Sequence, residues 1–474
     1  MALYDGTNAP IIKVYLDTGS RNQEKFILNY SLLGGSDLLG TYTPFTTLTQ
    51  LPTTDVKQIN IRRGRTREDQ QVQPGQLTFT LDNTSGSYDP ELIKSALITA
   101  ASGNGTTVTY TSNHNLNVGD IVTVLNLTAT ALNLKLQTVT TVSATEFTVS
   151  NTATGSCTGQ TTAAYFSGYV NTTVQNFLTA STGVRVTATM SGGTERNLFT
   201  GFIEQIDKDL SLEPTVTITC VDALAQLGRR RTNVDVNTLG DGDAVAKILT
   251  DIGWQGTLDG SANNFTVSSV PTGDALQMID QITSTQLGLF RIDSNGDAIW
   301  NGGDVFETGS FAGAFKYFTM TDARTSNDVV EYDSISVIGG EKYMRNTINA
   351  TNTRTDGVVT TFTKFNSAGA GRFGSIPASV NLFFAAADAS TAAQNLADQF
   401  ANPQYRVDQI SFECVGFSSA LWDNILLADL GVAVIVKRTP IYTTEKTYNC
   451  WIQQLNHDIT PNTWRMSLTL SPAT

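Results

Sequence analysis

The segment Leu16–Ser20 is the part of this chain that most resembles a catalytic loop. Its residues, LDTGS, follow an apolar run, and such a loop can hold one of two carboxylates that share a proton during peptide hydrolysis. A two-lobed enzyme needs a second loop of this kind, which the sequence lacks, and a homodimeric one is normally a much smaller chain. Because the same residue types favour tight turns, we interpret the segment as a hairpin turn and predict no catalytic residue.

Asp293, Asn295 and Asp297 alternate along the chain and could supply oxygen ligands to calcium. The segment lacks the distal Glu of an EF-hand loop, and its Asn295–Gly296 pair is typical of a type I′ hairpin turn. We therefore predict a plain turn here and no metal site.

Histidine and cysteine are too few and too scattered for the usual catalytic or metal-binding groupings. The two histidines, His114 and His457, fall in different parts of the chain, which gives no basis for a histidine-based triad. No C-x-x-C pair occurs, so we expect buried free thiols at the four cysteines, Cys157, Cys220, Cys414 and Cys450. No phosphate-binding glycine motif is present either, and we predict no cofactor.

Arginine gathers in two places, which are the candidate partner interfaces. Such runs are either solvated loops or contacts with an acidic partner or a neighbouring subunit, where Arg forms bidentate pairs. The net charge of −13 argues against a surface that holds nucleic acid. The candidate residues are Arg62, Arg63, Arg65 and Arg67 in one loop, and Arg229, Arg230 and Arg231 in another.

Composition indicates a large soluble protein with several cores. Of the 474 residues, 40% are hydrophobic and 15% are charged, which is enough for two to four domains. The N-terminus lacks a cationic start followed by an apolar block, and no apolar run approaches the ~18 residues of a membrane helix. We expect a product made in the cytoplasm with no membrane segment.

Most of the chain alternates apolar and polar residues with period two, which predicts strands. The stretch 97–168 differs, because its only charged residues are Asp120, Lys135 and Glu146, and this favours a β domain inserted into a loop. The predicted division is a first β-barrel from 1–96 and 169–235, the insert at 97–168, a small α+β domain at 236–303, and a second β-barrel with one helix at 304–474.

Four segments have helical spacing. Asp222 is expected to cap a short helix that ends at Gly228. Asp243 and Asp274 are expected to cap two amphipathic helices before the Asn295–Gly296 hairpin. The fourth helix is expected from Thr391 to Asn402, where Pro403 ends it.

Two distant passages repeat each other. GVRV at Gly183 matches GVAV at Gly431, an offset of 248, and FIEQIDKD at Phe202 matches WIQQLNHD at Trp451, an offset of 249. The next apolar positions, from Val216 and Met466, match at an offset of 250. This pattern predicts two related barrels in one chain, although chance alternation in a β-rich chain remains the alternative.

The order of motifs resembles the tail hub proteins of tailed bacteriophages, also called baseplate hub or minor tail proteins. The resemblance rests on the runs RRGRTRE…PGQLTFTLDN and LFTGFIEQI…TVTITCVDALAQL, the helix–hairpin block and the C-terminal strands through LTLSP. It implies a mainly β fold with two tail-tube-like barrels, a small helix–hairpin domain and an inserted β domain.

The resemblance also implies a structural, non-enzymatic role. The expected assembly is a homotrimeric ring at the distal end of the tail in the virion, because two barrels per chain let three copies imitate six units. The expected partners are tail tube or distal tail ring proteins and tail fibre or spike proteins. DNA would pass through the channel without specific binding.

Two other functions remain open from the sequence. A host-surface adhesin that binds carbohydrate is suggested by the polar, β-rich insert. A tail-associated hydrolase is suggested by the Leu16–Ser20 segment.

Overall fold

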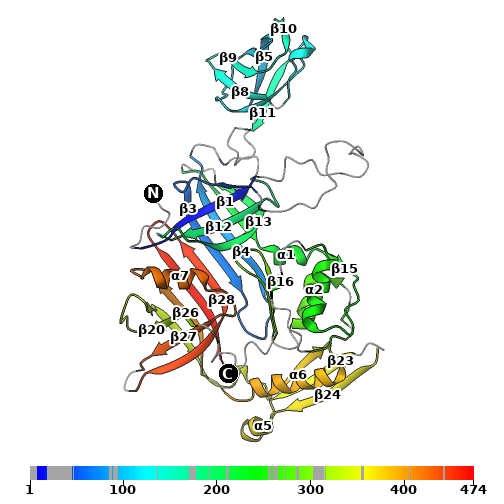
Figure 1. The fold of residues 1–474 in the computed structure, drawn as a ribbon, viewed down its shortest axis with the longest axis vertical. Coiled ribbons are helices and arrows are strands. Elements are labelled where there is room, and N and C mark those ends of the chain that lie inside the picture. The colour runs from blue at the N-terminus through cyan, green and yellow to red at the C-terminus, as the bar shows by residue number, and fades with distance from the viewer. Residues whose placement is uncertain are drawn as a thin grey trace.

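The fold was analysed in a computed structural model. It describes residues 8–18, 45, 47–84, 88, 94–135, 137–169, 178–190, 192–209, 213–254, 258–259, 265–268, 270–271, 273–283, 288–302, 314, 316–353, 357–403, 405–440 and 443–473. Strands dominate, and the longest sheet runs through both halves of the sequence (Figure 1). The hairpin predicted around Leu16–Ser20 implies a second strand near Leu28, which lies outside the described residues.

The first barrel segment is a run of antiparallel strands that we call the first unit. Its strands alternate buried apolar and outward polar residues, because one face covers a core. In pairing order they are β12 (Gly183–Thr189), β13 (Glu195–Asp209), β14 (Thr215–Val221), β4 (Gln73–Asp82) and β3 (Val56–Gly64). β1 (Ile11–Asp17) and β2 (Leu48–Gln50) extend the sheet beyond β12.

The second unit repeats this arrangement. In pairing order its strands are β27 (Ala433–Arg438), β28 (Lys446–Ile459), β29 (Trp464–Pro472), β26 (Arg406–Glu413) and β22 (Ser334–Ile338). β20 (Lys316–Thr321) and β21 (Val330–Glu331) continue beyond β27, but through parallel pairing. The two units therefore share five strands in the same order and differ at this edge.

The register of the two units confirms most of the internal repeat and corrects one part of it. β13 and β28 each carry a bulge after an isoleucine, Ile203 or Ile452, so these strands match at an offset of 249. β14 and β29 match at 250, as expected. The GVRV–GVAV match at 248 is wrong, because the positive-φ residue that precedes the strand is Ser181 in one unit and Gly431 in the other, an offset of 250.

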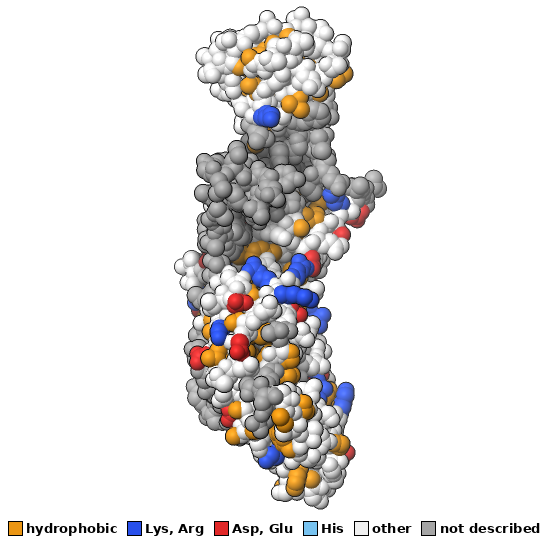
Figure 2. All heavy atoms as spheres, turned by 90° about the vertical axis from the view of Figure 1, so that its right-hand side faces the viewer, with side chains coloured by type: hydrophobic (Ala, Val, Ile, Leu, Met, Phe, Trp, Pro, Cys, Tyr) orange, Lys and Arg blue, Asp and Glu red, His pale blue; other side chains and the backbone are white. Residues whose placement is uncertain are grey.

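The stretch 97–168 lies within a closed six-stranded barrel with its own hydrophobic core. β5 (Lys94–Asn104) pairs with both β6 (Thr107–Ser112) and β11 (Ala164–Tyr169), and the ring is completed by β7 (Ile121–Leu125), β8 (Gln137–Val142) and β9 (Glu146–Ser150). β10 (Thr154–Cys157) adds to β5, and a 3₁₀ turn spans Thr130–Leu132. Figure 2 shows few charged side chains on the visible face of this barrel.

The α+β region contains the predicted helices and hairpin. α1 (Ala223–Leu227) is capped by Asp222, and Asp274 accepts a hydrogen bond from the Gln277 amide at the start of α3 (Ala275–Thr283). α2 (Asp241–Asp251) begins two residues before the predicted cap, Asp243. The short strands are β15 (Arg231–Thr232), β16 (Leu258–Asp259), β17 (Gly273–Asp274), β18 (Leu289–Ile292) and β19 (Ala298–Asn301).

The turn between β18 and β19 is longer than the predicted type I′ turn. Only Gly296 has a positive φ, of 94°, and the Asp293 amide donates to the Asp297 carbonyl. The Asp293 carboxylate accepts hydrogen bonds from the amides of Asn295 and Asp297, a pattern that fits the plain turn expected from the sequence.

The C-terminal third has three α-helices among its described residues, where the sequence pattern predicted one. The predicted helix is α6 (Ala386–Gln399), which begins five residues before Thr391. It packs on a separate three-stranded sheet of β23 (Thr347–Thr353), β24 (Val359–Phe365) and β25 (Pro377–Leu382). The others are α5 (Ser367–Phe373) and α7 (Ser419–Leu427), and a 3₁₀ turn spans Glu341–Tyr343.

In the part of the chain that the structure describes, no helix is both long enough and apolar enough to cross a bilayer.

A candidate assembly surface

The two units join edge to edge through β3 and β28, and we call this pairing the seam. The first half of β28 pairs with β27, while its second half, Gln454–Ile459, pairs with Ile59–Gly64 of β3. β29 pairs with the other edge of β28. One continuous sheet therefore runs from β13 of the first unit to β22 of the second.

Gly64 makes the seam possible. Its φ is +115°, and a Cβ at this position would lie 2.2 Å from the Gln453 carbonyl oxygen. The next residue, Arg65, donates its amide to that oxygen at 2.9 Å. Only glycine combines this backbone conformation with so close an approach.

One face of the continuous sheet is mostly polar along its eight strands, although Val221 and Phe202 continue one of its rows. Directly opposed residues in antiparallel strands point to the same side, so the register defines rows across the sheet. One row contains Ser334, Ser411, Ser467, Asn456, Arg62 and Gln76, and another contains Glu413, Arg465, Asp458, Asn60, Thr78, Thr219 and Gln205. The face carries mostly hydroxyl and amide groups.

The charges on this polar face are of both signs and partly engaged with neighbours. The Gln58 amide donates to Asp458 at 3.1 Å. Arg465 donates to the Ser411 hydroxyl at 3.1 Å and lies 3.6 Å from Asp333. The face therefore offers no block of cations of the kind that holds a phosphate backbone.

The opposite face of the sheet packs into an apolar core, and His457 is buried there. This side chain is 3% exposed and accepts a hydrogen bond from the Trp464 indole at 3.2 Å. Burial, with the nearby Arg63 charge, lowers the pKa of His457 to about 3. His457 is therefore neutral at physiological pH and serves packing.

No protein-family model matches the sequence, and no curated protein does. Among solved structures, the tail protein from Neisseria meningitidis MC58 superimposes on 90% of this chain and 94% of its own, with a TM-score of 0.50 and 9% sequence identity. This chain has the fold of that tail protein. The 43 kDa tail protein of prophage MuSo2 from Shewanella oneidensis covers 90% of this chain and 96% of its own, with a TM-score of 0.47 and 9% identity.

Within this tail-protein fold, the arginines of the first basic loop take different positions. Arg62 is exposed on the polar face. Arg63 is 4% exposed and lies 2.7 Å from Asp429, which precedes β27. Arg65 is also 4% exposed and donates to the Gln453 side chain at 2.7 Å and to the Gly288 carbonyl at 2.9 Å. Arg67 contacts Asp69 and lies over the Tyr343 ring.

Arg63, Arg65 and Arg67 thus bind other parts of the same chain, which leaves Arg62 as the exposed member of this loop. A fourth arginine, Arg406, completes the arrangement, because it forms a bidentate pair with Glu68 at 2.9 and 2.7 Å. Sequence reasoning missed Arg406 and Glu68, since nothing in their local patterns connects positions 338 residues apart.

The second basic run, Arg229–Arg231, lies at the surface between α1 and β15. Arg229 is 68% exposed and lies 3.0 Å from Glu204, and Arg230 donates to the Ile252 carbonyl at 2.7 Å. Figure 2 shows basic side chains gathered on the side of the molecule that carries these elements. The side chains of this run and of Arg62 are exposed.

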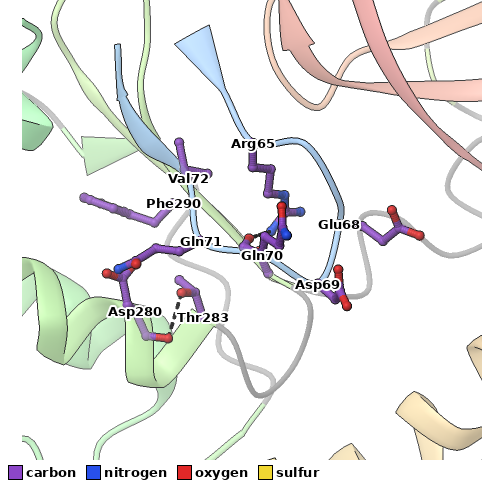
Figure 3. A pocket seen from close by; sticks show the side chains of 10 residues that line it. Arg65, Glu68, Asp69, Gln70, Gln71, Val72, Asp280, Thr283 and Phe290 are labelled. Atoms are coloured by element: carbon purple, nitrogen blue, oxygen red, sulfur yellow. Dashed lines mark hydrogen bonds between the residues drawn. The ribbon is translucent and has the colours of Figure 1, made fainter. Parts of the chain in front are cut away.

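A small pocket lies under the loop that follows β3 (Figure 3). Arg65, Gln70 and Val72 come from the loop, and Asp280 and Thr283 come from α3. Burial, with the nearby Asp274 charge, raises the pKa of Asp280 to about 8. One Asp280 carboxylate oxygen is buried and has no hydrogen-bond partner among the described residues.

The described residues contain no group of three or more His, Cys, Asp or Glu side chains placed to hold a metal ion. Asp17 is 2% exposed at the end of β1, and its carboxylate accepts a hydrogen bond from the Phe45 amide at 2.6 Å. The rest of the predicted LDTGS turn, from Gly19, lies outside the described residues.

Proposed function

We propose that this chain is a structural subunit of a phage tail and that three copies close into a ring at its distal end. The ring surrounds the passage by which DNA leaves and joins the tail tube to fibres or a spike. The seam supports this proposal most directly, because it joins two equivalent units head to tail. A head-to-tail contact repeats until the rotation closes a ring, and two units per chain give six units from three chains.

The polar face supplies the wall of the passage in this proposal. Its hydroxyl and amide groups can be solvated without attracting phosphates, and its few charges have both signs. The overall net charge of −13 adds repulsion between the chain and DNA. A wall of this kind lets DNA pass without specific binding.

The partners in this proposal are other tail proteins, contacted away from the passage. Arg229, Arg230 and Arg231 would face an acidic surface of a tail tube, distal ring, fibre or spike protein. The likeness to solved tail proteins supports a structural rather than an enzymatic role.

The molecular mass of the assembly tests the proposed ring. Light scattering on the purified chain should give about three times 51.0 kDa, roughly 153 kDa. If the chain is monomeric at high concentration, cryo-electron microscopy of assembled tails should show three copies around the passage. Any other copy number in the tail contradicts the proposal.

The inserted barrel favours an additional role in host attachment. It has a separate core and a nearly uncharged surface, both of which suit a module that projects from the ring and contacts a fibre or a carbohydrate. A glycan array probed with the whole protein tests the carbohydrate alternative. Virions that lack residues 97–168 and still carry fibres and adsorb normally would contradict this role.

A further inference from the structure

We infer that the free edge of β22 in one copy pairs with the second half of β13 in the next copy, in the register that the seam sets inside the chain. This inference rests on the proposed ring and names the contact that closes it. The partner surface is a second copy of the same chain.

The strands of the seam have counterparts at the two ends of the continuous sheet. β28 corresponds to β13 with an offset of 249, which the shared bulge fixes. β3 corresponds to β22 with a shift of 276, from Ile59 to Ile335. These two residues lie opposite Phe79 and Ile410, which in turn lie opposite the equivalent residues Ile218 and Leu468.

Glycine positions support this shift independently. A shift of 276 carries Gly64 onto Gly340, and both have a positive φ, of +115° and +111°. At Gly64 a Cβ would collide with the Gln453 carbonyl, whereas at Gly340 no heavy atom lies within 4 Å of the same position. Gly340 therefore has the backbone conformation of Gly64 in the seam. A neighbouring strand would fill the open space beside it.

Neither edge is paired with a described strand in the single chain. Among the described strands, β22 pairs only with β26, so its other edge is open. β12 covers its edge of β13 only as far as Phe202, and no described strand continues beyond that point along Gln205–Asp207. Unpaired edges of this kind are templates for strand addition by another chain.

The register follows from the seam. Inside the chain Arg62 lies opposite Asn456, and Gly64 lies opposite Gln454. The two correspondences convert these pairs into Ile338 opposite Asp207 and Gly340 opposite Gln205, between copies. The same rule places Glu204 of one copy against Gly340 of the next, as Gln453 lies against Gly64.

Cysteine cross-linking tests the register. In a Cys157→Ser background, the double variant Ile338→Cys/Asp207→Cys should form disulfide-linked dimers and trimers on oxidation, because opposed Cβ atoms in paired strands lie ~5 Å apart. The matched control, Ile338→Cys/Gln205→Cys, places the two thiols two positions out of register and should give at least about tenfold less product. The experiment is done on the purified chain and on assembled tails.

The outcomes separate this inference from the proposed function. Three copies per ring with no cross-link in the first variant, or with equal cross-linking in both, overturns the seam register and leaves the ring intact. A copy number other than three overturns the ring itself.

A second variant examines the glycine. Gly340→Val should abolish ring formation and leave the thermal midpoint of the monomer within a few degrees of that of Gly357→Val, a control with a positive φ of +79° and equally open surroundings. Rings that form normally with Gly340→Val would contradict the inference.

Discussion

At the scale of single residues, buried charge is placed where it joins segments far apart in the sequence. Arg406 and Glu68 are 5% and 9% exposed, and their side chains pair in bidentate geometry. A buried ion pair adds little net stability, but either partner alone is costly because its charge is left uncompensated. The pair therefore fixes how the loop after β3 meets the second unit.

Removing one partner of this pair should be strongly destabilising. We expect Arg406→Met to cost about 3–5 kcal/mol, and Glu68→Met/Arg406→Met to recover most of that loss, since no unpaired charge remains. Chemical denaturation followed by tryptophan fluorescence measures the change. Lys437→Met breaks the exposed pair with Glu445, at 3.0 Å, and should cost less than ~1 kcal/mol. Equal losses in the two single variants would contradict this account.

Asp280 should make stability depend on pH. Its pKa is raised to about 8 in the folded chain, against ~3.9 when unfolded, so the folded state binds more protons between these values. Stability should then fall as pH rises from about 4 to about 8. Asp280→Asn cannot ionise, so its thermal midpoint should exceed that of the wild type at pH 8 and match it more closely at pH 4.

At the scale of elements, β28 is the strand on which the architecture depends. It pairs with β27 and β3 along one edge and with β29 along the other, and its bulge at Gln453 marks the change of partner. The corresponding bulge in β13 lies where β12 ends. In both long strands the bulge therefore lies at the point where a second strand can take over the pairing.

Gly64→Ala should weaken the seam. The substitution combines a positive φ with a carbonyl oxygen 2.2 Å from the new Cβ, so we expect a loss above the ~1–3 kcal/mol of backbone strain alone. Differential scanning calorimetry should show a lower midpoint for the transition of the two units. Gly357→Ala carries the strain without the contact, and a loss as large as that of Gly64→Ala would argue against the role assigned to the seam.

The sequence predicted elements well where one local rule decided them. Alternation identified the strands around Ile59 and Phe79, and side-chain capping located Asp222 and Asp274. Prediction from the sequence failed where contacts between distant positions determine the structure. α7 is not among the helices that the sequence spacing predicts, and the burial of Arg63 depends on Asp429, 366 positions away. The internal repeat could have suggested that the two units join, but only the strand register shows that β3 and β28 form the seam.

At the scale of the whole molecule, the strands of the inserted barrel pair only with one another among the described strands. Its core, built around Tyr110, Phe147 and Tyr165, is separate from the main core. Because each strand of the ring is paired on both edges, no edge needs the rest of the chain.

The isolated segment 94–169 should therefore fold alone. We expect a cooperative thermal transition and dispersed amide signals in a proton–nitrogen spectrum of this fragment. The remaining chain, with the segment replaced by a short Gly/Ser linker, should keep the midpoint of its own transition. A disordered fragment would contradict the independence of the barrel.

The seam also determines which domains would project from each position of a closed assembly. In the proposed ring every second junction would be built into a polypeptide, so three encounters instead of six would complete the circle. The closed barrel emerges only from the first unit, and the α6 sheet only from the second. Around a nearly hexagonal inner frame the appendages would therefore alternate, which gives a triangular outer outline on which threefold attachments can be seated.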